Sequence, residues 1–184
     1  KGKLINPSQL DSVWLRQPKN IEIRNFKLLY VGRIRVEKGI FALSELIRNK
    51  RDISLTIIGA EKGSSNKINQ SNIKIIPTQS NKTKLIKHYD DHNIFVLPSF
   101  TEGHPMALLE ALSRLRPVIV FKEIEHVIGK KNGIFASERN YDSLEKTIQH
   151  IINNYKSIQE EMKKNVLPTN DKFIEDIKNI ISEN

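Results

Sequence analysis

The fold of this chain is decided by residues 94–121, IFVLPSFTEGHPMALLEALSRLRPVIVF. The apolar run at 94–97 predicts a buried strand that ends at Pro98. Helix-forming residues follow at 105–114, and a second apolar run at 118–121 predicts another strand. Two strands joined through a helix by short links are typical of a βαβ unit, in which the strands run parallel.

The same alternation extends outward from this unit in both directions. Further strands are expected at 26–31, 53–58, 73–76 and 134–136. Further helices are expected at 37–49, 81–89, from Asn140 or Asp142 onward, at 155–165 and at 171–181. This order predicts an α/β fold, a Rossmann-like three-layer sandwich of about six parallel strands with helices on both faces. Ligands of such sheets bind beyond the carboxyl ends of the strands, so the loops after positions 31, 58, 76 and 97 are expected to carry the function.

Length and composition limit the domain organisation. The 184 residues fit one domain, with 26–184 as the globular unit and the polar stretch 1–25 as an interdomain linker and the start of that domain. The sequence has no run of about 18 apolar residues, the length that a membrane-spanning helix needs. It also has no cysteine, which excludes disulfides and thiolate metal sites and suits a cytoplasmic protein.

The net charge of +9 is unevenly distributed. Residues 1–90 hold 18 Lys and Arg against 7 Asp and Glu, whereas residues 91–184 hold 12 against 14. A basic first half suits phosphates, nucleic acid or an anionic membrane surface, and an ordinary solvated surface explains it equally well. Aromatic residues make up only 7% of the chain, and no stacking platform is recognisable, so nucleic acid is not the expected partner.

The segment GRIRVEKG, residues 32–39, lies between an expected strand and an expected helix. The helix is expected to begin near Glu37 or Lys38, where free N–H groups attract anions. Arg33, Arg35 and Lys38 add cations to the same region, so the segment suits a diphosphate. The alternative is an ordinary basic loop before a helix, and the segment alone does not decide between the two.

The segment PSFTEGHPMALLEALS, residues 98–113, also follows an expected strand and begins a helix. Glu102 in the loop and Glu110 in the helix are separated by seven residues, so both are expected to face the strand ends. Carboxylates accept paired hydrogen bonds from the vicinal hydroxyls of a ribose or a hexose. The alternatives are an acid that stabilises the helix dipole at Glu102 and a solvated helix residue at Glu110.

Together these segments resemble the C-terminal domain of GT-B glycosyltransferases of the group-1, or family 4, retaining class. The family's GR…KG segment is matched by LLYVGRIRVEKG, and its glycine-ended second strand by SLTIIGA. Its pattern with two spaced glutamates is matched by LIKHYDDHNIFVLPSFTEGHPMALLEALSRLRPVIV. Its interdomain linker and its G.NGLLV turn are matched by KLINPSQLDSVWLRQP and GKKNGIFA. The order and spacing of these matches over about a hundred residues make the resemblance specific.

The resemblance implies a role for each matching residue. Arg33 and Lys38 would hold the donor diphosphate and ease departure of the nucleotide, Glu102 would contact the transferred sugar, and Glu110 would bind the ribose hydroxyls. Glu102, Arg33 and Lys38 are thus the expected catalytic residues. The other expected donor-binding positions are Gly32 and Gly59 for close approach, Pro77, Thr78 and Gln79 at the base, and Gly103, His104, Pro105, Met106 and Ala107 at the sugar and phosphates. No metal or other cofactor is implied, because cations and helix N-termini replace Mg²⁺ in this class.

The sequence departs from the family pattern at VFKEIEHVIG, which is shorter than the usual SDVGGIPEVI and lacks its paired glycines. His126 falls near the acidic position of that motif. A catalytic acid and a surface histidine are both open interpretations of His126.

The resemblance also implies partners. The donor would be a UDP- or GDP-sugar, and the acceptor a glycan or glycolipid of envelope polysaccharide synthesis. The family's N-terminal acceptor-binding domain is not in this sequence. The full-length enzyme would be cytoplasmic or peripheral to the inner face of the membrane. Two other functions stay open, a GT-B relative such as a sugar-nucleotide epimerase or phosphorylase, and a basic nucleic-acid-binding domain.

Overall fold

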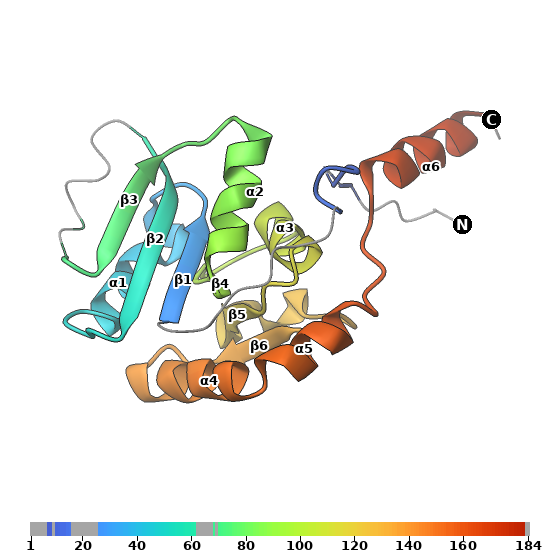
Figure 1. Cartoon of the computed structure of the whole chain (residues 1–184). Coiled ribbons are helices and arrows are strands. Elements are labelled where there is room, and N and C mark those ends of the chain that lie inside the picture. The colour runs from blue at the N-terminus through green and yellow to red at the C-terminus, as the bar shows by residue number, and fades with distance from the viewer. Residues whose placement is uncertain (1–6, 9, 16–25, 62–67, 69, 183–184) are drawn as a thin grey trace.

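The computed structural model describes residues 7–8, 10–15, 26–61, 68 and 70–182. Within these residues the chain forms a six-stranded sheet, ordered β3-β2-β1-β4-β5-β6, in which every pairing is parallel (Figure 1). The strands are β1 (Phe26–Val31), β2 (Ile53–Ala60), β3 (Ile73–Pro77), β4 (Ile94–Leu97), β5 (Val118–Phe121) and β6 (Ile134–Ser137). The strand order reverses between β1 and β4, and a sheet of this kind binds ligands at that switch point.

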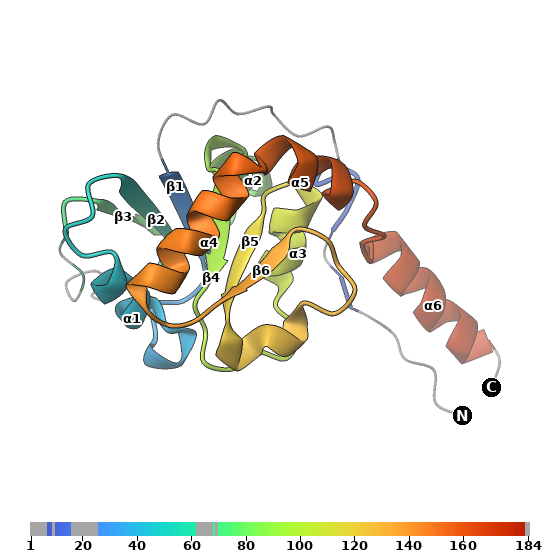
Figure 2. The same ribbon diagram turned by 90° about the horizontal axis from the view of Figure 1, so that it is seen from below.

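Helices cover both faces of the sheet, which confirms the expected Rossmann-like sandwich. Helices α2 and α3 lie on one face, and α1 and α4 lie on the other (Figures 1 and 2). The helices are α1 (Ile40–Leu46), α2 (Lys82–Asp91), α3 (Met106–Ser113), α4 (Tyr141–Asn153), α5 (Tyr155–Met162) and α6 (Asn170–Ser182). Asn81 and Asn140 cap α2 and α4, because their side chains accept hydrogen bonds from the N–H groups of Lys84 and Ser143.

The element boundaries match the expected ones at β4 and β5 and differ at the start of α1. Strands β4 and β5 are buried along their whole length, which explains why apolar runs predicted them. The helix expected from position 37 does not begin there. A 3-10 helix covers Val36–Lys38, Gly39 takes the left-handed conformation at φ 65°, and α1 begins only at Ile40. That left-handed residue separates Lys38 from the helix, so the expected helix start at Lys38 is wrong.

Part of the expected linker packs onto the domain. Leu10 and Trp14 are buried, and the Trp14 ring lies edge-on to the Tyr89 ring of α2 at 5.5 Å. The Leu10 carbonyl accepts a hydrogen bond from the Asn170 N–H at 2.8 Å, where α6 begins. Helix α6 then projects from the body of the domain beside this segment (Figures 1 and 2). The other residues of the linker, 1–6, 9 and 16–25, lie outside the described residues.

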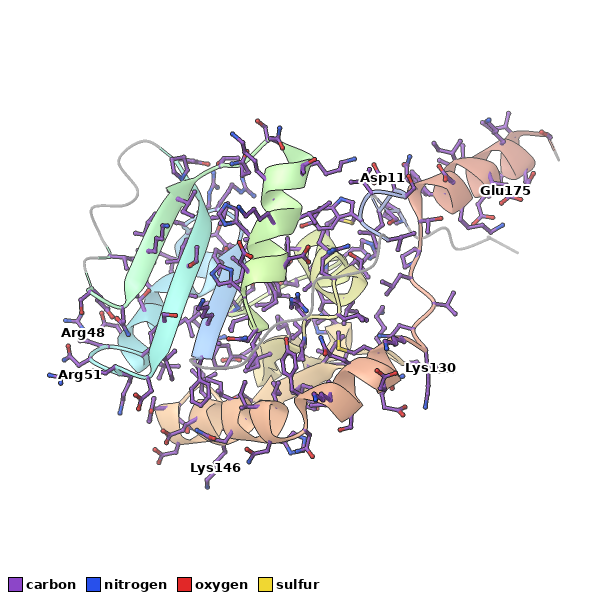
Figure 3. All side chains as sticks on the ribbon, in the orientation of Figure 1. Asp11, Arg48, Arg51, Lys130, Lys146 and Glu175 are labelled. Atoms are coloured by element: carbon purple, nitrogen blue, oxygen red, sulfur yellow. The ribbon has the colours of Figure 1, made fainter. Side chains whose placement is uncertain are left out.

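Most charged side chains, such as that of Lys146, point outward (Figure 3). Arg114 and Arg116 are exceptions, because only 3% and 1% of their side chains are exposed. Arg114 donates two hydrogen bonds of 2.8 Å to the Asp90 carboxylate and a third to the Trp14 carbonyl. This buried ion pair joins α2, the end of α3 and the start of the described chain.

Candidate functional site

The loops after β1 and β4 meet at the carboxyl edge of the sheet. The Phe100 N–H donates a hydrogen bond to the Glu37 carbonyl at 3.0 Å. Gly39 lies so close to the second loop that a Cβ atom there would fall 1.8 Å from the Pro98 carbonyl oxygen. Because β1 and β4 are neighbours in the sheet, the two expected functional segments form one site.

Lys38 and Glu102 form the centre of this site. The Lys38 ammonium lies 2.7 Å from Glu102 Oε1, and the Ser99 hydroxyl donates to the same oxygen at 2.7 Å. The side chains of Lys38 and Glu102 are 25% and 11% exposed, so the pair is partly withdrawn from water. A cation and a carboxylate from two different loops therefore face the same space above the strand ends.

Glu110 occupies a different environment. Its carboxylate accepts a hydrogen bond of 2.7 Å from the Tyr89 hydroxyl, between α2 and α3. Burial raises the pKa of Glu110, and the hydrogen bond from Tyr89 acts in the opposite direction. The interpretation of Glu110 as a solvated helix residue is therefore wrong. Glu102 and Glu110 also do not share a contact point, since one faces the β1 loop and the other faces α2.

Replacing Tyr89 with phenylalanine is expected to raise the pKa of Glu110, because the charged carboxylate loses its hydrogen-bond donor. The folded-state pKa is already above the usual value, so the native state binds more protons than the unfolded state. The contribution of Glu110 to the free energy of unfolding therefore falls as the pH rises from the usual pKa of a glutamate to the raised pKa of the folded state. Carbon-13 NMR titration of the Glu110 carboxyl group in both proteins measures the shift.

Tyr141→Phe is the matched control for this titration. Tyr141 donates a similar hydrogen bond to Glu145, but on the exposed surface of α4. The Tyr141→Phe substitution should leave the pKa of Glu110 unchanged. An unchanged or lowered pKa of Glu110 in Tyr89→Phe would show that the Tyr89 hydrogen bond does not stabilise the charged carboxylate.

The expected donor-binding glycines have a packing role. A Cβ atom on Gly59 would lie 2.3 Å from the Gly32 carbonyl oxygen, and the Gly32 N–H donates to the Ile58 carbonyl at 2.9 Å. These glycines therefore let the ends of β1 and β2 approach each other. Arg33 is exposed beside them, and its carbonyl accepts the Tyr30 hydroxyl at 2.9 Å.

The other expected positions lie around this centre. Gly103 and His104 are exposed, and His104 Nε2 lies 2.9 Å from the Pro7 carbonyl oxygen. Pro105, Met106 and Ala107 form the partly buried start of α3. Pro77 ends the edge strand β3, and Thr78 and Gln79 follow it; β2 and β1 separate this strand from β4. The structure thus joins the β1 and β4 loops directly and places 77–79 farther along the same edge.

Arg139 was not predicted as a site residue from the sequence, and His126 was left open between a catalytic acid and a surface histidine. Arg139, which follows β6, donates hydrogen bonds to the carbonyls of Pro98 and Ser99. His126 Nε2 lies 2.8 Å from the Glu102 carbonyl oxygen, so this histidine contacts the loop that carries the central carboxylate. The available signal for Arg139 was its place three residues after the last expected strand, 134–136, because the residues that follow a parallel strand lie at the carboxyl edge of the sheet.

Comparison with known proteins agrees with this architecture. The family described as "Glycosyl transferases group 1" matches residues 15–167 of the chain, which contain both loops of the site. The chain belongs to this family. The group 1 glycosyl transferase assignment covers all six strands and every expected site residue.

Individual relatives place this group 1 domain within larger proteins. The capsular polysaccharide biosynthesis glycosyltransferase CapM of Staphylococcus aureus is 29% identical over 143 residues, which are 70% of this chain and 37% of that protein. The sucrose-phosphate synthase of Thermosynechococcus elongatus shares the fold with a TM-score of 0.75 at 16% identity, over 96% of this chain and 51% of that one. The C-terminal domain of the group 1 protein LpcC of Francisella tularensis superposes with a TM-score of 0.54 at 18% identity, over 88% and 91% of the two chains. The fold matches that of the C-terminal half of GT-B glycosyltransferases.

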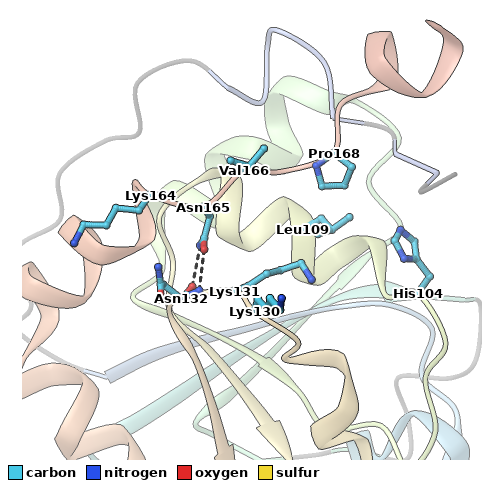
Figure 4. Close-up of a pocket in the computed structure, with 9 residues that line it drawn as sticks. All are labelled: His104, Leu109, Lys130, Lys131, Asn132, Lys164, Asn165, Val166 and Pro168. Atoms are coloured by element: carbon cyan, nitrogen blue, oxygen red, sulfur yellow. Dashed lines mark hydrogen bonds between the residues drawn. The ribbon is translucent and has the colours of Figure 1, made fainter. Parts of the chain in front are cut away.

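A cavity of about 500 Å³ adjoins the site of this group 1 domain on the side of His104 (Figure 4). Asn132 and Asn165 tie its walls together through two hydrogen bonds of 2.8 and 2.9 Å. Lys130 and Lys131 also line this cavity.

Within the described part of the chain, no three His, Asp or Glu side chains are grouped to hold a metal ion. None of the described helices is long and apolar enough to cross a membrane.

Proposed function

We propose that this chain is the donor-binding domain of a retaining glycosyltransferase that uses a UDP- or GDP-sugar. The observation that carries the proposal is the meeting of Lys38 and Glu102 at 2.7 Å where the β1 and β4 loops join. A cation for the diphosphate and a carboxylate for the sugar hydroxyls are then available at one place. Membership of the glycosyl transferase family supports the same function.

In the proposed reaction the bond between the anomeric carbon and the diphosphate oxygen breaks, and the diphosphate keeps the electron pair. Lys38 and Arg33 stabilise the negative charge that develops on the leaving diphosphate. The acceptor hydroxyl forms the new bond to the anomeric carbon, and its proton passes to the departing diphosphate oxygen. Glu102 orients the sugar, and Glu110 binds the ribose hydroxyls.

The acceptor side of the reaction belongs to the rest of the protein. The chain spans 37% of the length of CapM. We propose that the full-length protein also has an N-terminal acceptor-binding domain, with residues 1–25 as the linker to it. The name of CapM supports a role in capsular or other envelope polysaccharide synthesis, with a glycan or glycolipid as the acceptor. Analysis of the products of the full-length enzyme distinguishes transfer from epimerisation or phosphorolysis.

Titration of the chain with UDP, GDP, ADP and inorganic phosphate tests donor binding. We expect one nucleoside diphosphate to bind better than phosphate, and Lys38→Ala or Glu110→Ala to weaken that binding by about 1–3 kcal/mol. The control is Lys146→Ala, which removes an exposed lysine of α4 that points away from the domain. Isothermal titration calorimetry provides the affinities. Equal binding of all four anions by the unmodified chain would refute the proposed function.

A further inference from the structure

Arg139 holds the loop that carries Glu102. Its Nη1 and Nη2 groups donate hydrogen bonds to the carbonyls of Pro98 at 2.9 Å and Ser99 at 3.2 Å. Its Nε donates to Glu123 Oε1 at 2.7 Å, and only 15% of the arginine side chain is exposed. One guanidinium therefore joins the segments that follow β4, β5 and β6 at the carboxyl edge of the sheet.

Two aromatic rings contact this guanidinium. The central carbon of the guanidinium lies 4.1 Å from the centre of the Phe100 ring and 4.3 Å from the centre of the Phe121 ring. Phe100 belongs to the β4 loop, and Phe121 is the last residue of β5. Cation–π contacts on a partly desolvated arginine add to its hydrogen bonds, so the loop is held through both its backbone and a side chain.

The restraint extends from Arg139 to the site. Arg139 binds the Ser99 carbonyl, and the Ser99 hydroxyl donates to Glu102 Oε1 at 2.7 Å. The same Glu102 oxygen accepts from Lys38. We propose that Arg139 is a positioning residue, which holds the Pro98–Glu102 segment so that the Glu102 carboxylate meets Lys38. The consequence for sugar transfer rests on the proposed function, whereas the positioning itself does not.

The geometry requires arginine rather than any cation. Three hydrogen-bond donors of one rigid plane reach two carbonyls and a carboxylate, and the guanidinium carbon lies close to two aromatic rings. A lysine at position 139 keeps the charge but has a single nitrogen that cannot bridge the same acceptors. Arg139→Lys therefore separates the effect of the positive charge from that of the planar guanidinium with its three donors.

Hydrogen exchange measures the positioning without any ligand. The Phe100 N–H donates to the Glu37 carbonyl, so it is protected only while the two loops are docked. We expect exchange of this amide to be about tenfold faster or more in Arg139→Ala, and intermediate in Arg139→Lys. The amide of Ile119 inside β5 is the internal reference, and Arg48→Ala, which removes an exposed arginine of the surface pair with Glu45, is the control variant. Unchanged Phe100 protection in Arg139→Ala, with a folded protein, overturns the inference.

Ligand binding tests the functional consequence. The ratio of the Kd for UDP to that for UDP-glucose, and of GDP to GDP-mannose, reports the contribution of the sugar. We expect this ratio to fall about tenfold in Arg139→Ala, because a displaced Glu102 no longer contacts the sugar. The ratio should fall less in Arg139→Lys. An unchanged ratio in Arg139→Ala contradicts a role in sugar binding. If the unmodified chain binds none of these nucleotides, the proposed function fails, while the exchange of Phe100 still decides whether Arg139 positions the loop.

Discussion

Gly39→Ala is expected to destabilise the protein by about 3 kcal/mol or more and to separate Lys38 from Glu102. Two costs combine at this position. The left-handed backbone at φ 65° disfavours a side chain, and the new Cβ would lie 1.8 Å from the Pro98 carbonyl oxygen. Backbone atoms on both sides of that contact must move apart, so the β1 and β4 loops can no longer dock as they do.

Gly103→Ala provides the matched control, because it makes the same chemical change in the loop that carries Glu102. No atom lies within 4 Å of the position that a Cβ would take there. Its effect on unfolding should stay within about 0.5 kcal/mol. Urea unfolding of both variants gives the comparison. Equal stabilities for the two alanine variants would mean that the two loops do not pack at Gly39 as described.

Asp90→Asn is expected to lower the free energy of unfolding by about 3–5 kcal/mol. The carboxylate is the partner of the buried Arg114, which it binds through two hydrogen bonds of 2.8 Å, and it lies 3.8 Å from the buried Arg116. An amide keeps the shape of the side chain but removes the negative charge that offsets these two cations. The loss of stability follows from removing the Asp90 negative charge beside buried positive charge.

The chain carries its own reporter for this prediction. Trp14 is the single tryptophan, it is buried, and its carbonyl accepts a hydrogen bond from Arg114. Its fluorescence should shift to longer wavelength at lower urea concentration in Asp90→Asn. Glu45→Gln, which breaks an exposed ion pair with Arg48, should change stability by less than about 1 kcal/mol. If the two variants unfold alike, the Asp90 pair contributes no more than a surface pair.

The sequence by itself determined the succession of strands and helices along the chain. The apolar runs at 94–97 and 118–121 predicted β4 and β5 to the residue, because strands buried on both faces leave no room for polar side chains. Alternation of strand and helix then predicted a parallel sheet. Because ligands of such sheets bind at the carboxyl edge, the sequence also predicted that the loops with Lys38 and Glu102 form the functional site. These inferences depend only on local composition and on spacing along the chain.

Contacts between distant segments were decided by the tertiary structure alone. The sequence left Glu110 open between a ribose-binding residue and a solvated helix residue. The packing of α2 on α3 placed the Tyr89 hydroxyl 2.7 Å from it. Gly39 looked like part of a helix until the β4 loop occupied the place of its Cβ. Arg139 is a charged residue after a strand in the sequence, and it becomes a restraint on Glu102 only where three loops converge. Burial and hydrogen-bond partners depend on residues far apart in the chain, so the spacing of residues along the sequence could not predict them.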